Sequence, residues 1–171
     1  SPHFLFLAET DRERLTEFDL ASRLSYFLWS TMPDEELFEL ARNKQLSNPG
    51  VLKTQTERML NAPKAKQFTK NFAGQWLDLR DIDFTEPDAN LFPEFDELLR
   101  LSMVQETELF FAHILENDLS LMEFIDADFT FLNERLAKHY GIGDVQGQEF
   151  QKVALPSEEV RGGLLTQASL L

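Results

Sequence analysis

The chain has 171 residues, no cysteine, and a net charge of −14 from 30 acidic and 16 basic residues. It is long enough for one substantial hydrophobic core, and the absence of cysteine excludes disulfides, cysteine-ligated metals, a cysteine nucleophile and covalent haem attachment in this segment. The acidic balance argues against binding nucleic acid or an anionic membrane surface, and no run approaches the roughly 18 apolar residues of a membrane span.

Start signals at regular intervals predict four helices in the first half of the chain, over residues 16–29, 35–42, 49–60 and 63–79. The capping residues are Thr16, Asp34 and Asn48. Gly74 lies inside the fourth helix, where glycine is unfavourable by about 1 kcal/mol relative to alanine. We therefore expect a neighbouring helix to approach closely at Gly74.

The longest helix is predicted over residues 93–116, with Pro93 at its first position. Its apolar residues fall on one broad arc when plotted at helical spacing, which is typical of a helix surrounded by neighbours. They are Phe95, Leu98, Leu99, Met103, Leu109, Phe110 and Ile114. The same arc contains three polar residues, Ser102, Glu106 and His113.

Residues 80–92 read as a long, acidic loop, and a short turn of helix is expected over 121–125. A further helix starts at Thr130 or Asn133 and ends at Tyr140, before Gly141.

Residues 150–155 favour a short strand, and a last helical pattern follows Gly163. Connections are short and no βαβ unit is evident. The sequence thus predicts an all-α fold, an irregular orthogonal or up-down bundle of about seven or eight helices with at most one short hairpin or strand near 150–155.

Glu106 is the main candidate for chemistry, because glutamate is rarely buried without a partner. With His113 it could form an acid–base pair, but the two residues lie about 10 Å apart along the helix axis and cannot easily share one metal ion. The alternative is structural: Glu106 pairs with an inward-facing arginine, Arg23 before others, or with Asn71 or Gln75. Arg23, Glu106 and His113 are thus the weak catalytic candidates, and no metal or cofactor site is predicted.

Other polar clusters favour structural roles. Asp126 and Asp128 lack the glycine and the terminal glutamate of a calcium loop. The acids of residues 78–88 are typical of a solvated loop, with weak cation binding as the alternative. Residues 161–163 lack the spacing of a phosphate loop and indicate a turn into a helix.

Several segments in fixed order resemble a known family. They are FDLASRLSYFLW (18–29), NFAGQWL (71–77), ETELFF (106–111), FTFLNERLAKHYG (129–141) and RGGLLTQAS (161–169). Together they resemble a planctomycete-type family of exported multidomain proteins whose helical modules are known only as domains of unknown function. In that family a cytochrome c-like domain often lies upstream.

The resemblance implies that residues 1–8 are the tail of a preceding module, 9–158 a helical domain of unknown function, and 159–171 the start of a following module. It also implies export, to the periplasm or beyond, and allows haem in another domain of the full-length protein. This segment itself lacks the Cys-x-x-Cys-His haem motif. The resemblance brings no known catalytic residues.

Three roles follow as hypotheses. The first is a scaffold or interaction module whose partners are neighbouring modules of the same polypeptide. The second is part of an enzyme active site, with Glu106 and Arg23 in an open pocket completed by neighbouring modules. The third is an acidic docking surface for a redox partner, whose binding would be sensitive to salt.

Overall fold

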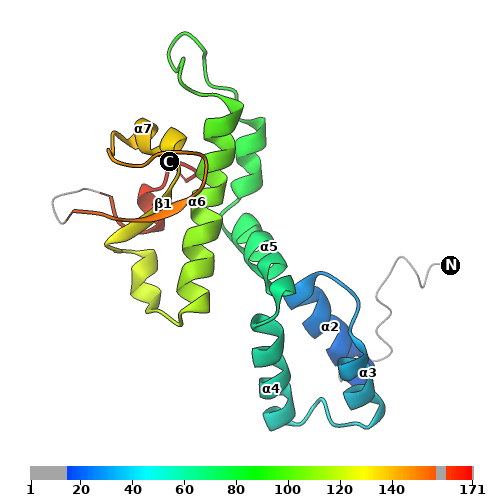
Figure 1. Cartoon of the computed structure of the whole chain (residues 1–171). Helices are drawn as coiled ribbons and strands as arrows, with labels where there is room; N and C mark the ends of the chain where they lie inside the picture. The colour runs from blue at the N-terminus through cyan, green and yellow to red at the C-terminus, as the bar shows by residue number, and fades with distance from the viewer. Residues whose placement is uncertain (1–14, 157–160, 171) are drawn as a thin grey trace. The chain divides into compact units, whose positions relative to one another are not determined.

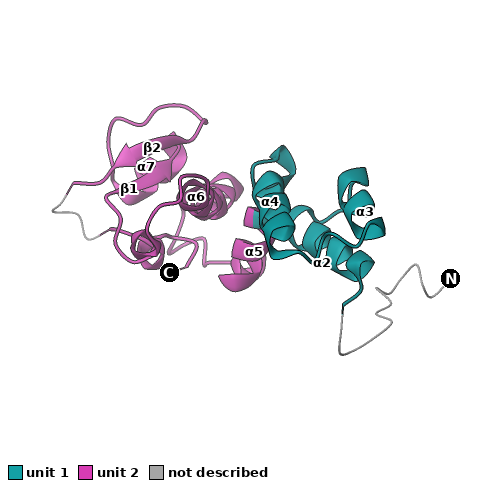
Figure 2. Cartoon of the chain, turned by 90° about the horizontal axis from the view of Figure 1, so that it is seen from below, with its two compact units in different colours: residues 1–68 teal, residues 69–171 magenta. Residues whose placement is uncertain are grey.

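The computed structural model describes residues 15–156 and 161–170, which form a mostly helical structure with one small sheet (Figure 1). The chain divides into two compact units, residues 1–68 and 69–171 (Figure 2). The predicted tail, residues 1–8, and the first residues of the predicted following module lie outside the described residues.

The N-terminal unit is built from short helices with strong caps. Its elements are α2 (Glu17–Trp29), α3 (Glu35–Arg42), α4 (Pro49–Leu60) and the 3₁₀ turn η1 (Pro63–Ala65). The predicted caps are confirmed: Thr16 forms a capping box with Asp19, and the side chains of Asp34 and Asn48 accept backbone N–H groups at the starts of α3 and α4.

A hydrophobic core joins these helices. The indole of Trp29 is 3% exposed, and its Nε1–H donates to the backbone oxygen of Met59 at 2.9 Å. Asp34 also accepts from the guanidinium of Arg58 at 2.7 Å, which links the start of α3 to the end of α4. The helix α5 (Lys66–Trp76) begins in this unit and continues into the next.

The C-terminal unit surrounds one long helix, α6 (Glu97–Glu116), seen in Figure 1. The other elements are η2 (Leu79–Phe84), η3 (Leu121–Phe124), β1 (Phe129–Leu132), α7 (Glu134–Tyr140), β2 (Gln151–Ala154) and η4 (Leu164–Thr166). α6 contacts β1, α7, η2 and η3. Its residues Leu99, Met103, Phe110 and Ile114 are buried, as the predicted arc requires, whereas Leu98, which was placed on the same arc, is exposed.

The start of α6 corrects the prediction that Pro93 is its first residue. Asp96 is the N-cap, with its side chain accepting the N–H of Leu99 at 2.7 Å. Pro93 lies in a turn closed by a bond from the N–H of Phe95 to the oxygen of Phe92 at 3.0 Å. A carboxylate that accepts a backbone N–H makes a stronger start than a proline that only tolerates the position.

The small sheet confirms one predicted strand and adds one that was missed. β2 falls inside the predicted 150–155, and it pairs antiparallel with β1, from Phe129 opposite Ala154 to Leu132 opposite Gln151. The helix predicted from Thr130 or Asn133 begins after Asn133, whose side chain accepts the N–H of Leu136. Thr130 therefore belongs to a strand.

Three other predictions need correction. Residues 80–92 are not a plain loop, because the turn η2 extends to Phe84. The last helical pattern is only the three-residue turn η4 within the described residues. Gly74 is not in close contact with a neighbour, because a Cβ added there would meet no atom within 4 Å.

Candidate functional site

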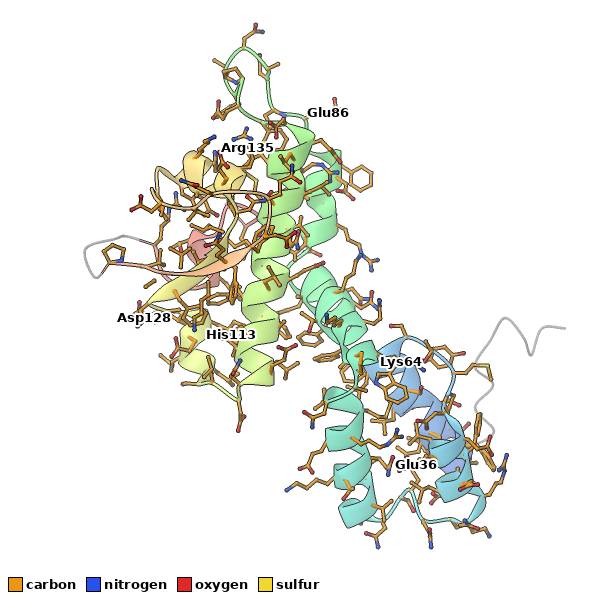
Figure 3. All side chains as sticks on the ribbon, viewed as in Figure 1. Glu36, Lys64, Glu86, His113, Asp128 and Arg135 are labelled. Carbon is orange, nitrogen blue, oxygen red and sulfur yellow. The ribbon has the colours of Figure 1, made fainter. Side chains whose placement is uncertain are left out.

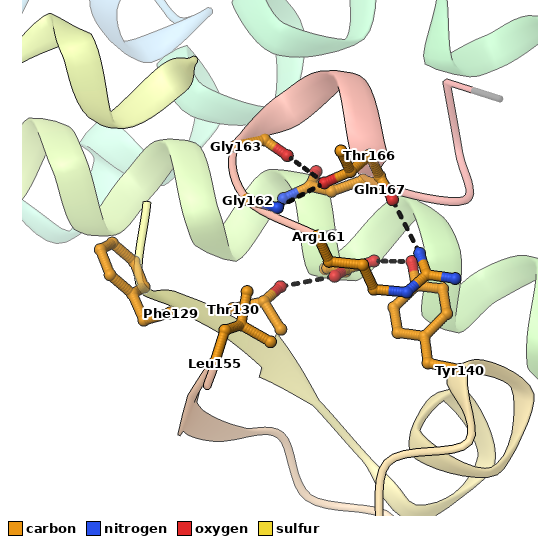
Figure 4. Close-up of a pocket in the computed structure, with 10 residues that line it drawn as sticks. Phe129, Thr130, Tyr140, Leu155, Arg161, Gly162, Gly163, Thr166 and Gln167 are labelled. Atoms are coloured by element: carbon orange, nitrogen blue, oxygen red, sulfur yellow. Dashed lines mark hydrogen bonds between the residues drawn. The ribbon is translucent and has the colours of Figure 1, made fainter. Parts of the chain in front are cut away.

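Glu106 lies at the centre of a buried polar network on α6. Its side chain is 1% exposed. One carboxylate oxygen, Oε1, accepts the hydroxyl of Thr130 at 2.5 Å, and Oε2 accepts the hydroxyl of Tyr140 at 2.5 Å (Figure 4). Two hydroxyl donors of the C-terminal unit thus bind the carboxylate, one at each oxygen.

Secondary structure positions both donors. Thr130 is paired opposite Val153 in the sheet, which fixes its direction toward α6. Tyr140 is the last residue of α7, and Gly141 ends that helix in the left-handed conformation with φ of 72°. Leu136, one turn earlier in α7, is fully buried in the core with Leu99, so the helix cannot rotate Tyr140 away.

Residues 161–170 complete the network from one side. The guanidinium of Arg161 lies 3.9 Å from the centre of the Tyr140 ring, within the range of a cation–π interaction. Arg161 also donates to the backbone oxygen of Thr166 at 2.8 Å. Gly163 has φ of 73°, and an added Cβ would lie 2.4 Å from the oxygen of Ile125, so the chain can pass here only as glycine.

Thr107, next to Glu106 on α6, binds the same segment. Its hydroxyl lies 2.6 Å from Oε1 of Gln167 and 2.7 Å from the hydroxyl of Ser169. The hydroxyl of Tyr140 in turn accepts the backbone N–H of Ala168 at 2.8 Å. Thr107 therefore holds this segment directly, and Glu106 holds it through Tyr140. We call residues 161–170 the terminal strap.

Burial dominates the electrostatics of the network. It raises the pKa of Glu106 from 4.5 to about 7, against the opposing effects of the Thr130 and Tyr140 hydrogen bonds and of the Arg161 charge. Burial also raises the pKa of Tyr140, and the negative charge of Glu106 raises it further. The phenol is therefore a hydrogen-bond donor throughout the physiological pH range.

The space beside Glu106 is very small. The cavity has a volume of about 10 Å³ and is lined by Glu106, Thr130, Tyr140, Arg161, Gln167 and their neighbours. That is about the room that one water molecule needs. Among the described residues Glu106 therefore does not open into a cleft of substrate size, which the active-site hypothesis required.

His113 lies in different surroundings, near the C-terminal end of α6 (Figure 3). Its ring stands edge-on to Phe129 and Phe131, with centroids 5.2 and 5.4 Å away, and its Nε2 lies 2.9 Å from Nζ of Lys152. Burial and the Lys152 charge lower the pKa of His113, so the neutral ring can accept a hydrogen bond from the lysine ammonium group. His113 shares no hydrogen-bond partner with Glu106.

Arg23 lies on α2 in the N-terminal unit, so its predicted pairing with Glu106 stays a prediction. Within residues 15–156 and 161–170, no group of three or more histidine or acidic side chains is placed to hold a metal ion. In the same ranges, no helix combines the length and the apolar character needed to cross a membrane.

Sequence reasoning missed Thr130, Tyr140 and Arg161 as partners of Glu106. Thr130 and Tyr140 lie 24 and 34 residues beyond Glu106 in the sequence. Helical periodicity relates only residues within one element, so it does not reveal contacts at such separations. The one usable signal was Arg161 followed by two glycines, which indicated a tight turn but not its neighbour.

These features define a mostly helical module with a sealed polar network at the centre of its C-terminal unit. Residues 15–142 match the model of PSD4, described as a protein of unknown function (DUF1592), and the chain belongs to this family. No curated protein and no solved structure matches the chain. The resemblance to a family of domains of unknown function is thereby confirmed at this level.

Proposed function

We propose that this chain is a scaffold module that anchors adjoining segments of the same polypeptide through its C-terminal unit. The observation that carries this proposal is that Thr107 and Tyr140 bind the terminal strap, with Tyr140 held in turn by Glu106. The network ends at Ala168, Gln167 and Ser169, so its buried hydroxyls contact polypeptide.

The energetics suit an anchor. A net hydrogen bond contributes about 0.5–1.5 kcal/mol, whereas a buried donor or acceptor left without a partner costs about 1–3 kcal/mol. Removing the strap would expose the Thr107 and Tyr140 hydroxyls together with the apolar surface around Leu164, which is 4% exposed. The strap and the residues that bind it therefore stabilise each other.

An enzymatic role has less support. A general acid or base must reach the atom that it protonates or deprotonates. Glu106 is enclosed by side chains of its own unit, and its cavity of about 10 Å³ leaves no room for an organic substrate. Turnover of a defined substrate by this chain, abolished by Glu106→Gln, would contradict the scaffold proposal.

The wider setting belongs to the same proposal and rests on the resemblance of the sequence. It comprises neighbouring modules as partners, export to the periplasm or beyond, and a cytochrome c-like domain elsewhere in the full-length protein. Cell fractionation with an antibody to the chain tests the export. Recovery in the cytoplasmic fraction alone would refute it.

A second role, docking of a basic redox partner, is favoured by one surface feature. Phe84 is 85% and Leu91 is 72% exposed, in a segment that also carries Glu86 and Asp88 (Figure 3). Apolar anchors among acids suit a partner with an apolar patch framed by lysines. Binding to such a partner should weaken strongly with salt, and binding indifferent to salt would exclude this role.

The scaffold proposal is tested with Thr107→Val, which keeps the shape of the side chain and removes its hydroxyl. We expect faster hydrogen exchange at the amides of Ala168 and Gln167, by about tenfold if about 1.4 kcal/mol is lost. The control is Thr54→Val on α4, where an exposed hydroxyl bonds only to the oxygen of Gly50. Equal exchange at Ala168 in the wild type and in Thr107→Val would refute the anchoring role.

A further inference from the structure

A second hollow lies on the C-terminal unit, away from the Glu106 network. It has a volume of about 460 Å³ and is bounded by residues of α5, η2 and α6. Small-molecule sites commonly measure about 300–1,000 Å³. We call it the α5–α6 groove. Its apolar lining consists of Leu79, Leu101, Val104 and Leu109.

Gly74 keeps this groove open. It is a buried residue inside α5 and lines the groove, yet a Cβ at this position would meet no atom within 4 Å. The glycine is therefore not required by helix packing, although it disfavours the helix by about 1 kcal/mol relative to alanine. A methyl group at this position would therefore meet no neighbouring atom.

Most charges that line the groove already have partners. Arg100 forms ion pairs with Asp83 and Glu97. Arg80 donates to the side-chain oxygen of Asn71 at 3.5 Å. The charges of Arg100, Asp83 and Glu97 largely compensate one another, whereas Arg80 adds a positive charge at the rim because its partner is a neutral amide.

Lys70 and Glu108 differ from this pattern. They face the groove from different walls, Lys70 from α5 and Glu108 from α6, and neither forms a hydrogen bond or ion pair with another described residue. Glu108 is half-buried, and burial raises its pKa, an effect that the charge of Lys70 only partly offsets. Beside the rim cation Arg80, the groove thus presents Lys70 and Glu108 as an opposite pair of charges that form no ion pair with each other.

We propose that the α5–α6 groove binds a small zwitterion, an α-amino acid with an apolar side chain. The ammonium group would bind the Glu108 carboxylate, the carboxylate would bind Lys70, and the side chain would lie on Leu79, Val104 and Leu109. Charge-assisted hydrogen bonds are about twice as strong as neutral ones. A ligand with only one of the two charges would leave the other protein charge uncompensated.

The probe is L-leucine, compared with N-acetyl-L-leucine and L-leucinamide, which lack the ammonium and the carboxylate charge respectively. Each is titrated into the ¹⁵N-labelled 171-residue chain, and the amide signals of Gly74, Val104 and Glu108 are followed. We expect saturable shifts with L-leucine and about tenfold weaker binding of each blocked analogue. Absence of saturable shifts with L-leucine, or equal affinity for all three compounds, overturns the proposal.

Two variants assign the charges. Glu108→Gln should bind L-leucine and N-acetyl-L-leucine equally, and Lys70→Gln should bind L-leucine and L-leucinamide equally. The matched control is Glu123→Gln, a half-buried acid on η3 outside the groove, and it should preserve the wild-type preference. A preference that survives in both groove variants overturns the assignment of Lys70 and Glu108.

Gly74→Leu tests the location, because its Cβ would meet no neighbouring atom and the rest of its side chain would occupy space that the ligand needs. It should abolish the shifts of Val104 and Glu108 while circular dichroism retains the helical signal. Gly74→Ala is the milder companion and should weaken binding less. Undiminished binding in a folded Gly74→Leu protein places the ligand elsewhere and refutes the site.

Discussion

The buried acid Glu106 predicts a specific pH dependence of stability, which Glu106→Gln should remove. The carboxyl of Glu106 has a pKa of about 7 in the folded chain, whereas the ordinary pKa of a glutamate is 4.5. Below pH 4.5 both states carry the proton, and the group does not disfavour folding. As the pH rises toward 7, the unfolded state releases the proton while the folded state keeps it, so the folded state loses relative stability.

The magnitude follows from that pKa difference. A pKa unit corresponds to about 1.4 kcal/mol, so the free energy of unfolding should fall by about 3 kcal/mol between about pH 4 and about pH 8 because of Glu106 alone. Glutamine has a similar shape and does not titrate. As the pH rises over this range, the wild type should therefore lose about 3 kcal/mol of stability relative to Glu106→Gln.

The assay is urea unfolding followed by circular dichroism at a series of pH values. For a urea dependence of about 1–3 kcal/mol per molar, the midpoint of the wild type should move by about 1–3 M relative to that of the variant. Other carboxylates titrate in both proteins and cancel in the difference. Glu57→Gln, an exposed acid on α4, is the control and should show no such trend. A difference between the wild type and Glu106→Gln that is constant with pH would refute the reasoning.

Three further substitutions test the architecture by thermal and urea unfolding. Gly74→Ala should stabilise the chain by about 0.4–1 kcal/mol, since the added methyl group meets no atom; destabilisation would show that a neighbour does pack there. Asp96→Ala should reduce stability by about 1 kcal/mol because α6 loses its N-cap, and an unchanged melting temperature would place the start of α6 elsewhere. Gly163→Ala should reduce stability by about 2 kcal/mol or more, because its Cβ would collide with the oxygen of Ile125; a neutral effect would mean that the strap is not seated as described.

Local chemistry explains which elements could be predicted from the sequence. A cap such as Thr16 or Asn48 is a contact between residues two or three positions apart, so the sequence contains both partners side by side. The same holds for Gly141 at the end of α7. The arc of α6 was equally accessible, because helical spacing alone decides which of its residues share a face.

Contacts between distant residues explain what was missed. Phe129–Leu132 becomes a strand because Gln151–Ala154 pairs with it, although its sequence also suits the start of a helix. The start of α6 was misplaced because Pro93 and Asp96 are both valid start signals, and the choice depends on the turn before them. The hydroxyl partners of Glu106 required the sheet and α7 to be placed first.

The boundary of the family match bears on the role of the buried network. Glu106, Thr107, Thr130 and Tyr140 all lie within residues 15–142, whereas the terminal strap lies beyond them. The residues that bind the strap therefore belong to the matched region, and the strap belongs to the sequence that follows it. Keeping an acid buried at neutral pH is unfavourable. Under the anchoring role that we propose, Glu106 orients the Tyr140 hydroxyl that binds Ala168 of the strap.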